Sequence, residues 1–271
     1  MDEEIVAIFC RCDDFLKDCG HREPEGQRMS DAEVMTTALV AMFYFGGNQE
    51  RARSLLRSPA YVPTMLSKSR FNRRLHALEP IWWRFVRWLG DRRKPYTRRF
   101  LIDSFPVAVC DNYRIRRCRI YRDEAYRGCI ASKRRFFYGL RVHWITTDSG
   151  SPVECFLAPG SFADVSALQT FDWDLPAGSE VIGDAAYNHY EMEDLLHEAA
   201  DIHLRPIRKK NSQRVQPPWE RFVLCHVRKR VETAGSLVER MMPKSIHAVT
   251  AKGFELKVLL FIAAYSLSFL V

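Results

Sequence analysis

Apolar residues near the N-terminus recur at intervals of three and four positions. This spacing is typical of an amphipathic helix, whose apolar side chains share one face. The residues that carry the pattern are Ile5, Ile8, Cys12 and Leu16. The sequence therefore predicts a helix at the start of the chain.

A second helix has a clear predicted beginning and end. Ser30 and Glu33 have the spacing of a capping box, in which Ser30 is the N-cap and Glu33 is the third helical residue. An apolar segment follows through Phe45, and the pair Gly46 and Gly47 ends it. Further helices are predicted at residues 49–57 and from Ser69 onward, so residues 1–95 are expected to be helical throughout.

The hydrophobic period changes after residue 99. Short apolar runs predict strands, and they are bounded by Pro, Gly, Asp or Ser, which favour turns. The expected strands are 100–103 and 107–109 on either side of Pro106, then 136–147, 152–157, 181–184 and 202–207. A turn is predicted at 148–151, a helix at 190–200, and closing helices from about Val227.

This order of elements predicts a helical N-terminal domain at residues 1–95 and a second domain at 96–271. Helices are followed by a hairpin-rich sheet and then by alternating strands and helices, which is typical of an α+β or α/β catalytic domain. The sequence shows no internal repeat and no low-complexity linker.

Composition and charge narrow the class of partner. A hydrophobic content of 47% and a charged content of 27% are typical of a soluble globular chain with a core. The net charge of +8 favours a polyanionic partner. Basic residues crowd at 84–141, 205–214 and 228–230. Such runs are often only solvated faces, but three of them beside candidate acids favour nucleic acid.

Cysteines and the C-terminal apolar run bear on location. The eight cysteines are irregularly spaced and the chain opens with an acidic segment, so reduced thiols in a cytoplasm are expected. Cys10, Cys12, Cys19 and His21 form only a weak zinc pattern. The apolar run 258–271 is shorter than the about 20 residues that span a bilayer, which predicts a buried terminal helix and no membrane partner.

Three acids are the candidate chemical groups. Asp103 and Asp184 each end an apolar strand-like run, and Glu232 lies in a predicted helix just after a basic run. One such acid alone is ordinarily a turn or helix cap. Three together in a basic protein can bind Mg²⁺ or Mn²⁺, which prefer carboxylate oxygens. Two such ions can activate an attacking oxygen and stabilise a leaving oxygen at phosphate.

Several segments resemble insertion-sequence transposases of the Asp-Asp-Glu (DDE) class, in the order in which they occur in that family. The segments are 69–75, 101–107 around Asp103, 133–143, 148–153, 160–164, 181–187 around Asp184, and 230–233 around Glu232. The resemblance runs from about residue 29 to the C-terminus.

The resemblance implies a ribonuclease-H-like fold, in which a mixed sheet flanked by helices brings three carboxylates together. It implies Asp103, Asp184 and Glu232 as catalytic metal ligands for Mg²⁺ or Mn²⁺, with two ions in the family's mechanism. The implied activity is hydrolysis at transposon ends and joining of the freed 3′-OH to target DNA. The expected partner is double-stranded DNA, to which the protein would bind as a homodimer. The expected location is a bacterial cytoplasm, in association with the nucleoid.

One part of the family pattern is only partly present. Arg228 and Glu232 match the Tyr-x2-Arg-x3-Glu-x6-Lys signature, but Cys225 stands at its Tyr and Glu239 at its Lys. We expect Glu232 rather than Glu239 to be the third ligand. Gly235 lies inside the same predicted helix.

Basic residues are the candidate DNA contacts. The candidates are Arg70, Arg73 and Arg74 on one helix, Lys133, and the run Arg228, Lys229 and Arg230. A solvated helix face is an equally good interpretation of the first three. Two alternative functions remain open: a metal-dependent nuclease of the same fold, and an inactive DNA-binding protein derived from a transposase.

Four further residues have competing interpretations. Asp164 is expected to be a helix cap, with a supporting role at the site as the alternative. His143, on a predicted strand, is more often a core or rim histidine than a DNA contact. Asp111 and Asp123 lie in an arginine-rich segment and are expected to pair with arginine rather than with metal.

Overall fold

The computed structural model describes residues 1–130 and 133–270, which form two compact units. The helical unit comprises Met1–Leu89 together with Val238–Val271, and the sheet unit comprises Gly90–Leu237. The change of unit at Gly90 lies close to the boundary expected from sequence. The C-terminal segment, however, groups with the N-terminal helices, whereas the sequence reading assigned it to the second domain.

The helical unit is organised around one buried helix, α2. Its helices are α1 (Asp2–Asp18), α2 (Asp31–Phe45), α3 (Gln49–Leu56), α4 (Lys68–Ala77), most of α5 (Glu79–Asp91) and α9 (Ala251–Leu267). Helix α2 contacts α1, α3, α4 and α9. It is buried on almost every side, because all but one of the residues from Asp31 to Met42 are excluded from solvent.

The predicted ends of α2 are confirmed. The Ser30 hydroxyl accepts a hydrogen bond from the Glu33 amide at 3.1 Å, and the Glu33 carboxylate accepts one from the Ser30 amide at 2.6 Å. Gly46 ends the helix with a φ of 53°, a left-handed conformation that costs glycine little.

The C-terminal apolar run forms a buried helix, as predicted. Residues from Val258 to Leu267 in α9 are buried, and Val271 lies outside the described residues. Among residues 1–130 and 133–270, none of the helices combines the length and apolarity of a membrane span.

The sheet unit contains one mixed sheet with six strands within the described residues. They are β1 (Arg99–Asp111), β2 (Arg127–Ile130), β3 (Arg135–Thr147), β4 (Pro152–Pro159), β5 (Ser179–Gly183) and β6 (Ile202–Pro206). Their order is β2-β3-β1-β5-β6, with β4 also paired to β3. Strand β3 is antiparallel to its neighbours, whereas β1, β5 and β6 are parallel. This confirms the predicted α+β class with a mixed sheet.

Strand β1 differs from its prediction. Two short runs were expected around Pro106, but β1 is continuous from Arg99 to Asp111. Its pairing explains why: β1 pairs with β3 along its length but with β5 only from Arg99 to Leu101. Pro106 therefore lies where one edge of β1 has no partner strand, and a residue without an amide hydrogen is tolerated there.

Helices cover both faces of the sheet. The described helices of this unit are α6 (Asp164–Ala167), α7 (Tyr190–Ala200) and α8 (Pro218–Met241), of which α8 belongs to it up to Leu237. Helix α8 begins nine residues earlier than the predicted start near Val227. Proline is favoured at the first helical position, so Pro218 begins the helix rather than preventing it.

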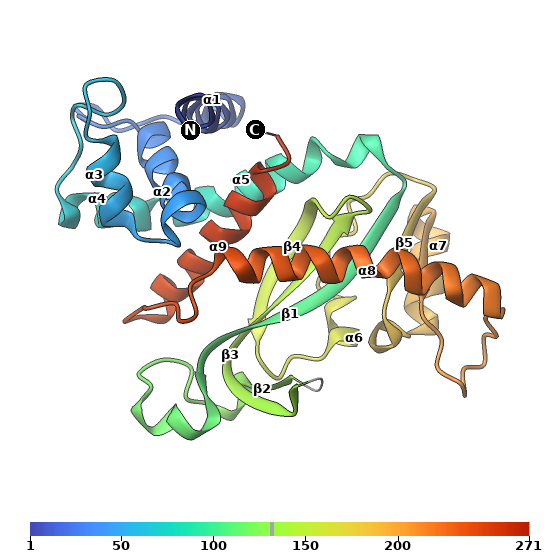
Figure 1. Ribbon diagram of the computed structural model, residues 1–271. Helices are drawn as coiled ribbons and strands as arrows, with labels where there is room; N and C mark the ends of the chain where they lie inside the picture. The colour runs from blue at the N-terminus through green and yellow to red at the C-terminus, as the bar shows by residue number, and fades with distance from the viewer. Residues whose placement is uncertain (131–132, 271) are drawn as a thin grey trace. The chain divides into compact units, whose positions relative to one another are not determined.

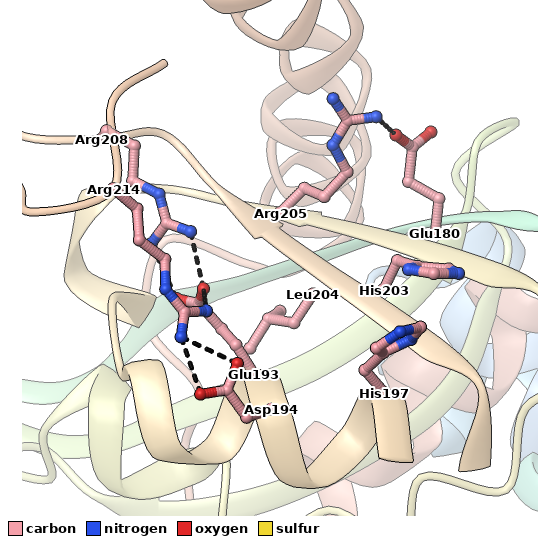
Figure 2. A pocket seen from close by; sticks show the side chains of 9 residues that line it. All are labelled: Glu180, Glu193, Asp194, His197, His203, Leu204, Arg205, Arg208 and Arg214. Carbon is pink, nitrogen blue, oxygen red and sulfur yellow. Dashed lines mark hydrogen bonds and ion pairs between the residues drawn. The ribbon is translucent and has the colours of Figure 1, made fainter.

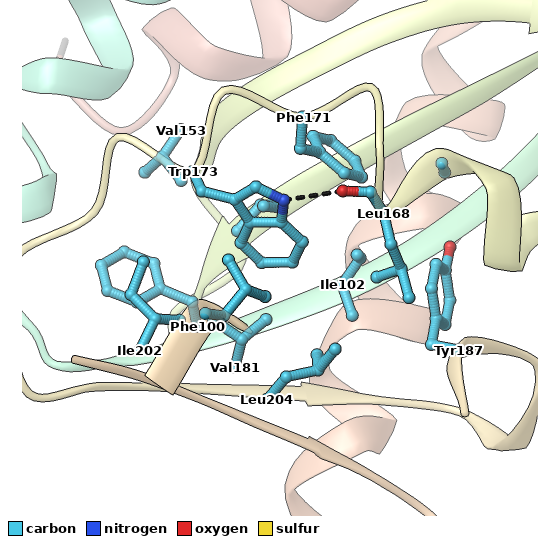
Figure 3. Packing of buried hydrophobic residues seen from close by; sticks show 13 residues of the cluster. Phe100, Ile102, Val153, Leu168, Phe171, Trp173, Val181, Tyr187, Ile202 and Leu204 are labelled. Carbon is cyan, nitrogen blue, oxygen red and sulfur yellow. Dashed lines mark hydrogen bonds between the residues drawn. The ribbon is translucent and has the colours of Figure 1, made fainter. Parts of the chain in front are cut away.

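The two faces of β1 have different environments. Phe100 and Ile102 point into an apolar core formed with β5, β6 and the segment around Trp173 (Figure 3). On the opposite face, α8 runs along the sheet (Figure 1) and buries a stripe of residues at helical spacing. That stripe consists of Leu224, Val227, Val231 and Ala234. Asp103 lies on this second face, because side chains alternate along a strand.

Candidate functional site

Two of the predicted acids lie where β1 and β5 separate. The last residue pair between these parallel strands is Leu101 with Ile182. Asp103 lies two residues further along β1, and Asp184 follows the end of β5 at Gly183. The amide of Ser104 donates to Asp103 Oδ1 at 2.9 Å. The sheet therefore brings together two acids that are 81 positions apart in the sequence.

Asp184 has two roles at once. Its Oδ1 accepts a hydrogen bond from the Ala186 amide at 2.8 Å and so caps the 3₁₀ turn Ala185–Tyr187. Its Oδ2 lies 3.7 Å from the Arg228 guanidinium. The capping interpretation and membership of the acidic cluster thus both hold for this residue.

Arg228 lies among all three predicted acids. Its guanidinium nitrogens are 3.9 Å from Asp103 Oδ2, 3.7 Å from Asp184 Oδ2 and 3.6 Å from Glu232 Oε1. Arg228 and Glu232 are four residues apart on α8, a spacing that puts their side chains on neighbouring positions of one helix face. Helix α8 thus supplies both the third acid and the cation that the three acids share.

The environment of Asp103 disfavours its charge. The pKa of the Asp103 carboxyl is raised to about 6, mainly by burial and to a smaller extent by the nearby carboxylates of Asp184 and Asp164. Arg228 and the Ser104 amide act in the opposite direction. A carboxylate in such a place is stabilised by a nearby cation. The cluster is therefore suited to positive charge.

The opposite face of β1 carries a polar network directly behind Asp103. The Ser104 hydroxyl donates to Asp164 Oδ1 at 2.5 Å and accepts from Arg141 Nη1 at 3.0 Å. Asp164 is the first residue of α6, whose N-cap is Ala163, so the expectation of a helix cap was wrong. Its carboxylate is used by Ser104 rather than by the helix amides.

Two aromatic residues border this network and are buried. His143 stacks on Phe156 with ring centroids 5.0 Å apart, which confirms a core histidine and not a DNA contact. The Tyr187 hydroxyl is buried, and the pKa of Tyr187 is raised well above its usual value by burial and by Asp164, Asp103 and Asp184.

Sequence reasoning missed Ser104, Arg141 and Tyr187. For the two strand residues a signal was available, because alternation along paired strands puts Ser104 and Arg141 on one face.

Residues 95–246 match the family described as Transposase DDE domain. This match covers more than half of the 271-residue chain and includes Asp103, Asp184 and Glu232. The chain belongs to the DDE transposase family. The resemblance noted in the sequence is thereby confirmed at the level of the family.

One solved structure is similar to this transposase over most of its length. It is the cryo-EM structure of the piggyBac transposase synaptic complex with hairpin DNA, with a TM-score of 0.44 and 10% sequence identity. The alignment covers 99% of this chain and 73% of the other. No curated protein sequence matches this transposase.

The candidate DNA contacts on α4 of the transposase have different surroundings. Arg70 and Arg73 are exposed, whereas Arg74 is mostly buried. Arg74 pairs with Asp31 and donates to Gln27 Oε1 at 2.5 Å and to the Met29 carbonyl at 2.6 Å. Arg74 therefore joins α4 to the segment that precedes α2, while Arg70 and Arg73 remain available to a ligand.

The other candidate contacts are mostly at the surface of the sheet unit. Lys133 and Lys229 are exposed, and Arg230 lies 3.5 Å from Asp148 Oδ2. Arg228 is only 20% exposed. Lys229 and Arg230 directly follow Arg228 on α8.

The basic run at 205–214 is largely neutralised within the transposase. Arg205 pairs with Glu180 and Glu220. Arg208 donates to Glu193, and Arg214 binds Glu193 and Asp194. The three arginines of this run are therefore paired within the protein, whereas Lys209 and Lys210 are exposed.

Three further expectations concern acids and a zinc site. Asp111 binds Arg135, as expected, while Asp123 accepts from the Ala125 amide at 2.8 Å and caps a short turn. The weak zinc pattern is not assembled, because Cys12 is buried in the core and His21 binds Asp31 at 2.7 Å.

Proposed function

We propose that this chain cleaves DNA at the ends of an insertion sequence and joins the freed 3′-OH to target DNA. The observation that carries the proposal is the convergence of Asp103, Asp184 and Glu232 around one guanidinium. Membership of the DDE transposase family supports DNA as the substrate. A homodimer that acts on two ends is part of the proposal, since symmetric ends suit a symmetric protein.

The donor chemistry of the acidic cluster suits a divalent metal ion. Its donors are all carboxylate oxygens, which Mg²⁺ and Mn²⁺ prefer. Each of the three carboxylates is already within 4 Å of a shared positive group, Arg228. When bound, one or two such ions supply activation of the attacking oxygen and stabilisation of the leaving oxygen. Asp103, Asp184 and Glu232 are the proposed ligands.

The remaining steps belong to the protein's own residues. Arg228 lowers the pKa of Asp103 and so keeps more of this carboxyl ionised near neutral pH. The Ser104 amide fixes one Asp103 oxygen and leaves the other directed at the cluster. Lys229 and Arg230 are proposed to attract the DNA backbone, because phosphates are held by basic side chains.

Cleavage and joining can be tested with labelled DNA that carries the terminal sequences of the encoding element. The DNA is incubated with purified chain, a target plasmid and Mg²⁺ or Mn²⁺. We expect cut ends and joined products from the unaltered chain. Asp103→Asn, Asp184→Asn and Glu232→Gln should each abolish both products while DNA binding persists.

Glu239→Gln is the matched control, because Glu239 lies on the same helix seven residues after Glu232. It should leave cleavage within a few fold of the unaltered chain. Cutting without joining would indicate a nuclease, and binding without cutting would indicate an inactive DNA-binding protein. Loss of cleavage in Glu239→Gln with retention in Glu232→Gln would show that the third acid is misassigned.

A further inference from the structure

A second group of metal-binding side chains lies at the turn between α7 and β6. His197 is in the last turn of α7, Asp201 ends that helix, and His203 is the second residue of β6. The Asp201 amide donates to the His197 carbonyl at 3.1 Å, and Asp201 adopts a left-handed conformation with φ of 52°. This tight turn brings the helix and strand residues to one place.

The three side chains already lie at the spacing of metal ligands. One ligand atom from each residue lies within 4.8 Å of the other two. Among residues 1–130 and 133–270, no other group of three His, Cys, Asp or Glu side chains meets that condition. His203 Nε2 is 3.4 Å from Asp201 Oδ1. Two ligands at about 2.1 Å from a tetrahedral ion are separated by about 3.4 Å.

The surroundings do not repel a cation. His197 and His203 lie next to each other on the wall of a cavity of about 420 Å³, with ring centroids 4.6 Å apart (Figure 2). Three arginines line the same cavity, but three acids there bind them. The pairs are Arg205 with Glu180, Arg208 with Glu193, and Arg214 with Asp194. Asp201 then adds a negative charge that no described lysine or arginine pairs with.

We propose that His197, Asp201 and His203 bind a divalent transition-metal ion of the zinc class, with water completing its coordination. Imidazole nitrogen together with carboxylate oxygen suits Zn²⁺ and Co²⁺, whereas Mg²⁺ takes oxygen ligands. The bound ion joins the last turn of α7 to the beginning of β6. Its role is to stabilise the sheet unit.

This site is separate from the acidic cluster. Strands β5 and β6 are parallel, and His203 pairs with Glu180 near their start. Asp184 follows Gly183 at their other end, four residues from Glu180, which corresponds to about 13 Å along a strand. An ion at the histidines therefore does not share ligands with an ion at Asp103.

Cobalt titration of the tag-free, metal-free chain tests the proposal. Co²⁺ bound by nitrogen and oxygen ligands in a tetrahedral site gives visible absorption. Added Mg²⁺ should not reduce this absorption, because it does not compete with Co²⁺ for such a site. We expect one equivalent of Co²⁺ with this absorption, displacement by one equivalent of Zn²⁺, and a higher Tm with either ion. The variant His197→Ala/His203→Ala should lose the absorption and bind more than about tenfold more weakly.

Two controls separate this site from others. His76→Ala removes an exposed helical histidine outside the group and should leave the absorption unchanged. Asp103→Asn should also leave the absorption unchanged. The cobalt titration therefore tests this site independently of the proposed DNA cleavage. Circular dichroism of the metal-free double variant checks that it folds. Absent absorption in the unaltered chain, or equal binding by the folded double variant, would overturn the proposal.

Discussion

Arg228 is the positive group that offsets the negative charge of the three acids. It is within 4 Å of all three, and replacing it leaves neighbouring carboxylates to repel each other. We expect Arg228→Ala to lower the free energy of unfolding of the metal-free chain by about 1–3 kcal/mol. Added Mg²⁺ should raise the Tm of this variant more than that of the unaltered chain.

Arg230→Ala is the comparison for this experiment. Arg230 is exposed and pairs with Asp148 at the surface, and such pairs contribute less than about 1 kcal/mol. Its removal should change neither stability nor the Mg²⁺ response by much. Equal Mg²⁺ responses in both variants would mean that Arg228 does not balance the acids. Urea unfolding with EDTA or Mg²⁺ measures both quantities.

We expect His143 to make the stability of the chain sensitive to acid. Burial, with a smaller contribution from Arg141, lowers the pKa of His143 to about 3, against an ordinary value of 6.5. Below pH 6.5 the unfolded chain binds a proton that the folded chain excludes, so stability falls as the pH falls from 6.5 toward 3. At pH 5 this loss is about 2 kcal/mol. We expect His143→Phe to lack this part of the decline.

Urea unfolding at pH 7 and pH 5 measures that difference. Phenylalanine retains the stacking on Phe156 and carries no proton, so the variant separates titration from packing. Parallel losses of stability in both proteins between the two pH values would show that His143 does not cause the acid sensitivity.

The residues of the site differ in how far the sequence reveals them. Asp103, Asp184 and Glu232 were found because each lies in a segment that resembles the family. Asp164 was found as a candidate but with the wrong interaction, since its partner Ser104 is 60 residues away. A single sequence does not specify which distant side chains meet. The packing of α6 against the sheet brings Asp164 to Ser104, and no local pattern encodes that packing.

At the scale of elements, predictions were accurate where local chemistry determines structure. Ser30 and Gly46 are within a few residues of the groups they satisfy, so the ends of α2 were predicted correctly. Pro106 was misleading because its effect depends on whether a strand lies on its amide side. Pro218 shows a similar dependence on context, because the same residue type ends a helix or begins one.

Two glycines should respond in opposite ways to substitution by alanine. A Cβ at Gly139 on β3 would be 2.9 Å from the Val109 amide nitrogen and closer still to the Val107 carbonyl. Gly139→Ala should therefore cost about 1–3 kcal/mol of stability. A Cβ at Gly235 on α8 meets nothing nearer than Trp144 at 4.0 Å. Gly235→Ala should stabilise the chain by about 0.5–1 kcal/mol, because alanine favours helix.

Chemical denaturation of the two variants measures both effects. Each variant is a control for the other, since the substitution is the same and only the surroundings differ. A stabilising Gly139→Ala would contradict the close approach of β3 to β1. A destabilising Gly235→Ala would mean that α8 is not helical at that residue.

At the scale of the whole molecule, the net charge of +8 acts on DNA through basic residues that are not paired with acids. If Arg70 and Arg73 contact phosphates, DNA affinity should fall steeply with salt, because each contact releases counterions. Arg70→Ala and Arg73→Ala should each reduce the slope of log affinity against log salt by about 1. Fluorescence anisotropy with duplex DNA at several salt concentrations gives the slope.

Arg11→Ala is the control for those slopes. Arg11 is also an arginine on a helix of the helical unit, but it lies 3.8 Å from Asp14. Its removal should leave the slope unchanged. Arg74→Ala should act differently again, by lowering stability, because Arg74 bonds to Asp31 and the Met29 carbonyl. Unchanged slopes for Arg70→Ala and Arg73→Ala would remove α4 from the DNA-binding surface.

The helical unit is formed by segments that lie before and after the sheet unit in the chain, and this order affects how it folds during synthesis. Helices α1 to α4 are synthesised before the sheet unit, whereas α9, which packs on α2, is synthesised after it. At roughly 5–20 residues per second, the sheet unit takes on the order of ten seconds to translate. Throughout that interval α2, apolar on almost every side, lacks part of its covering. The nascent chain therefore exposes apolar surface of α2 until α9 has been synthesised, and a chaperone would shield that surface. A premature stop codon before α9 would leave the surface exposed permanently.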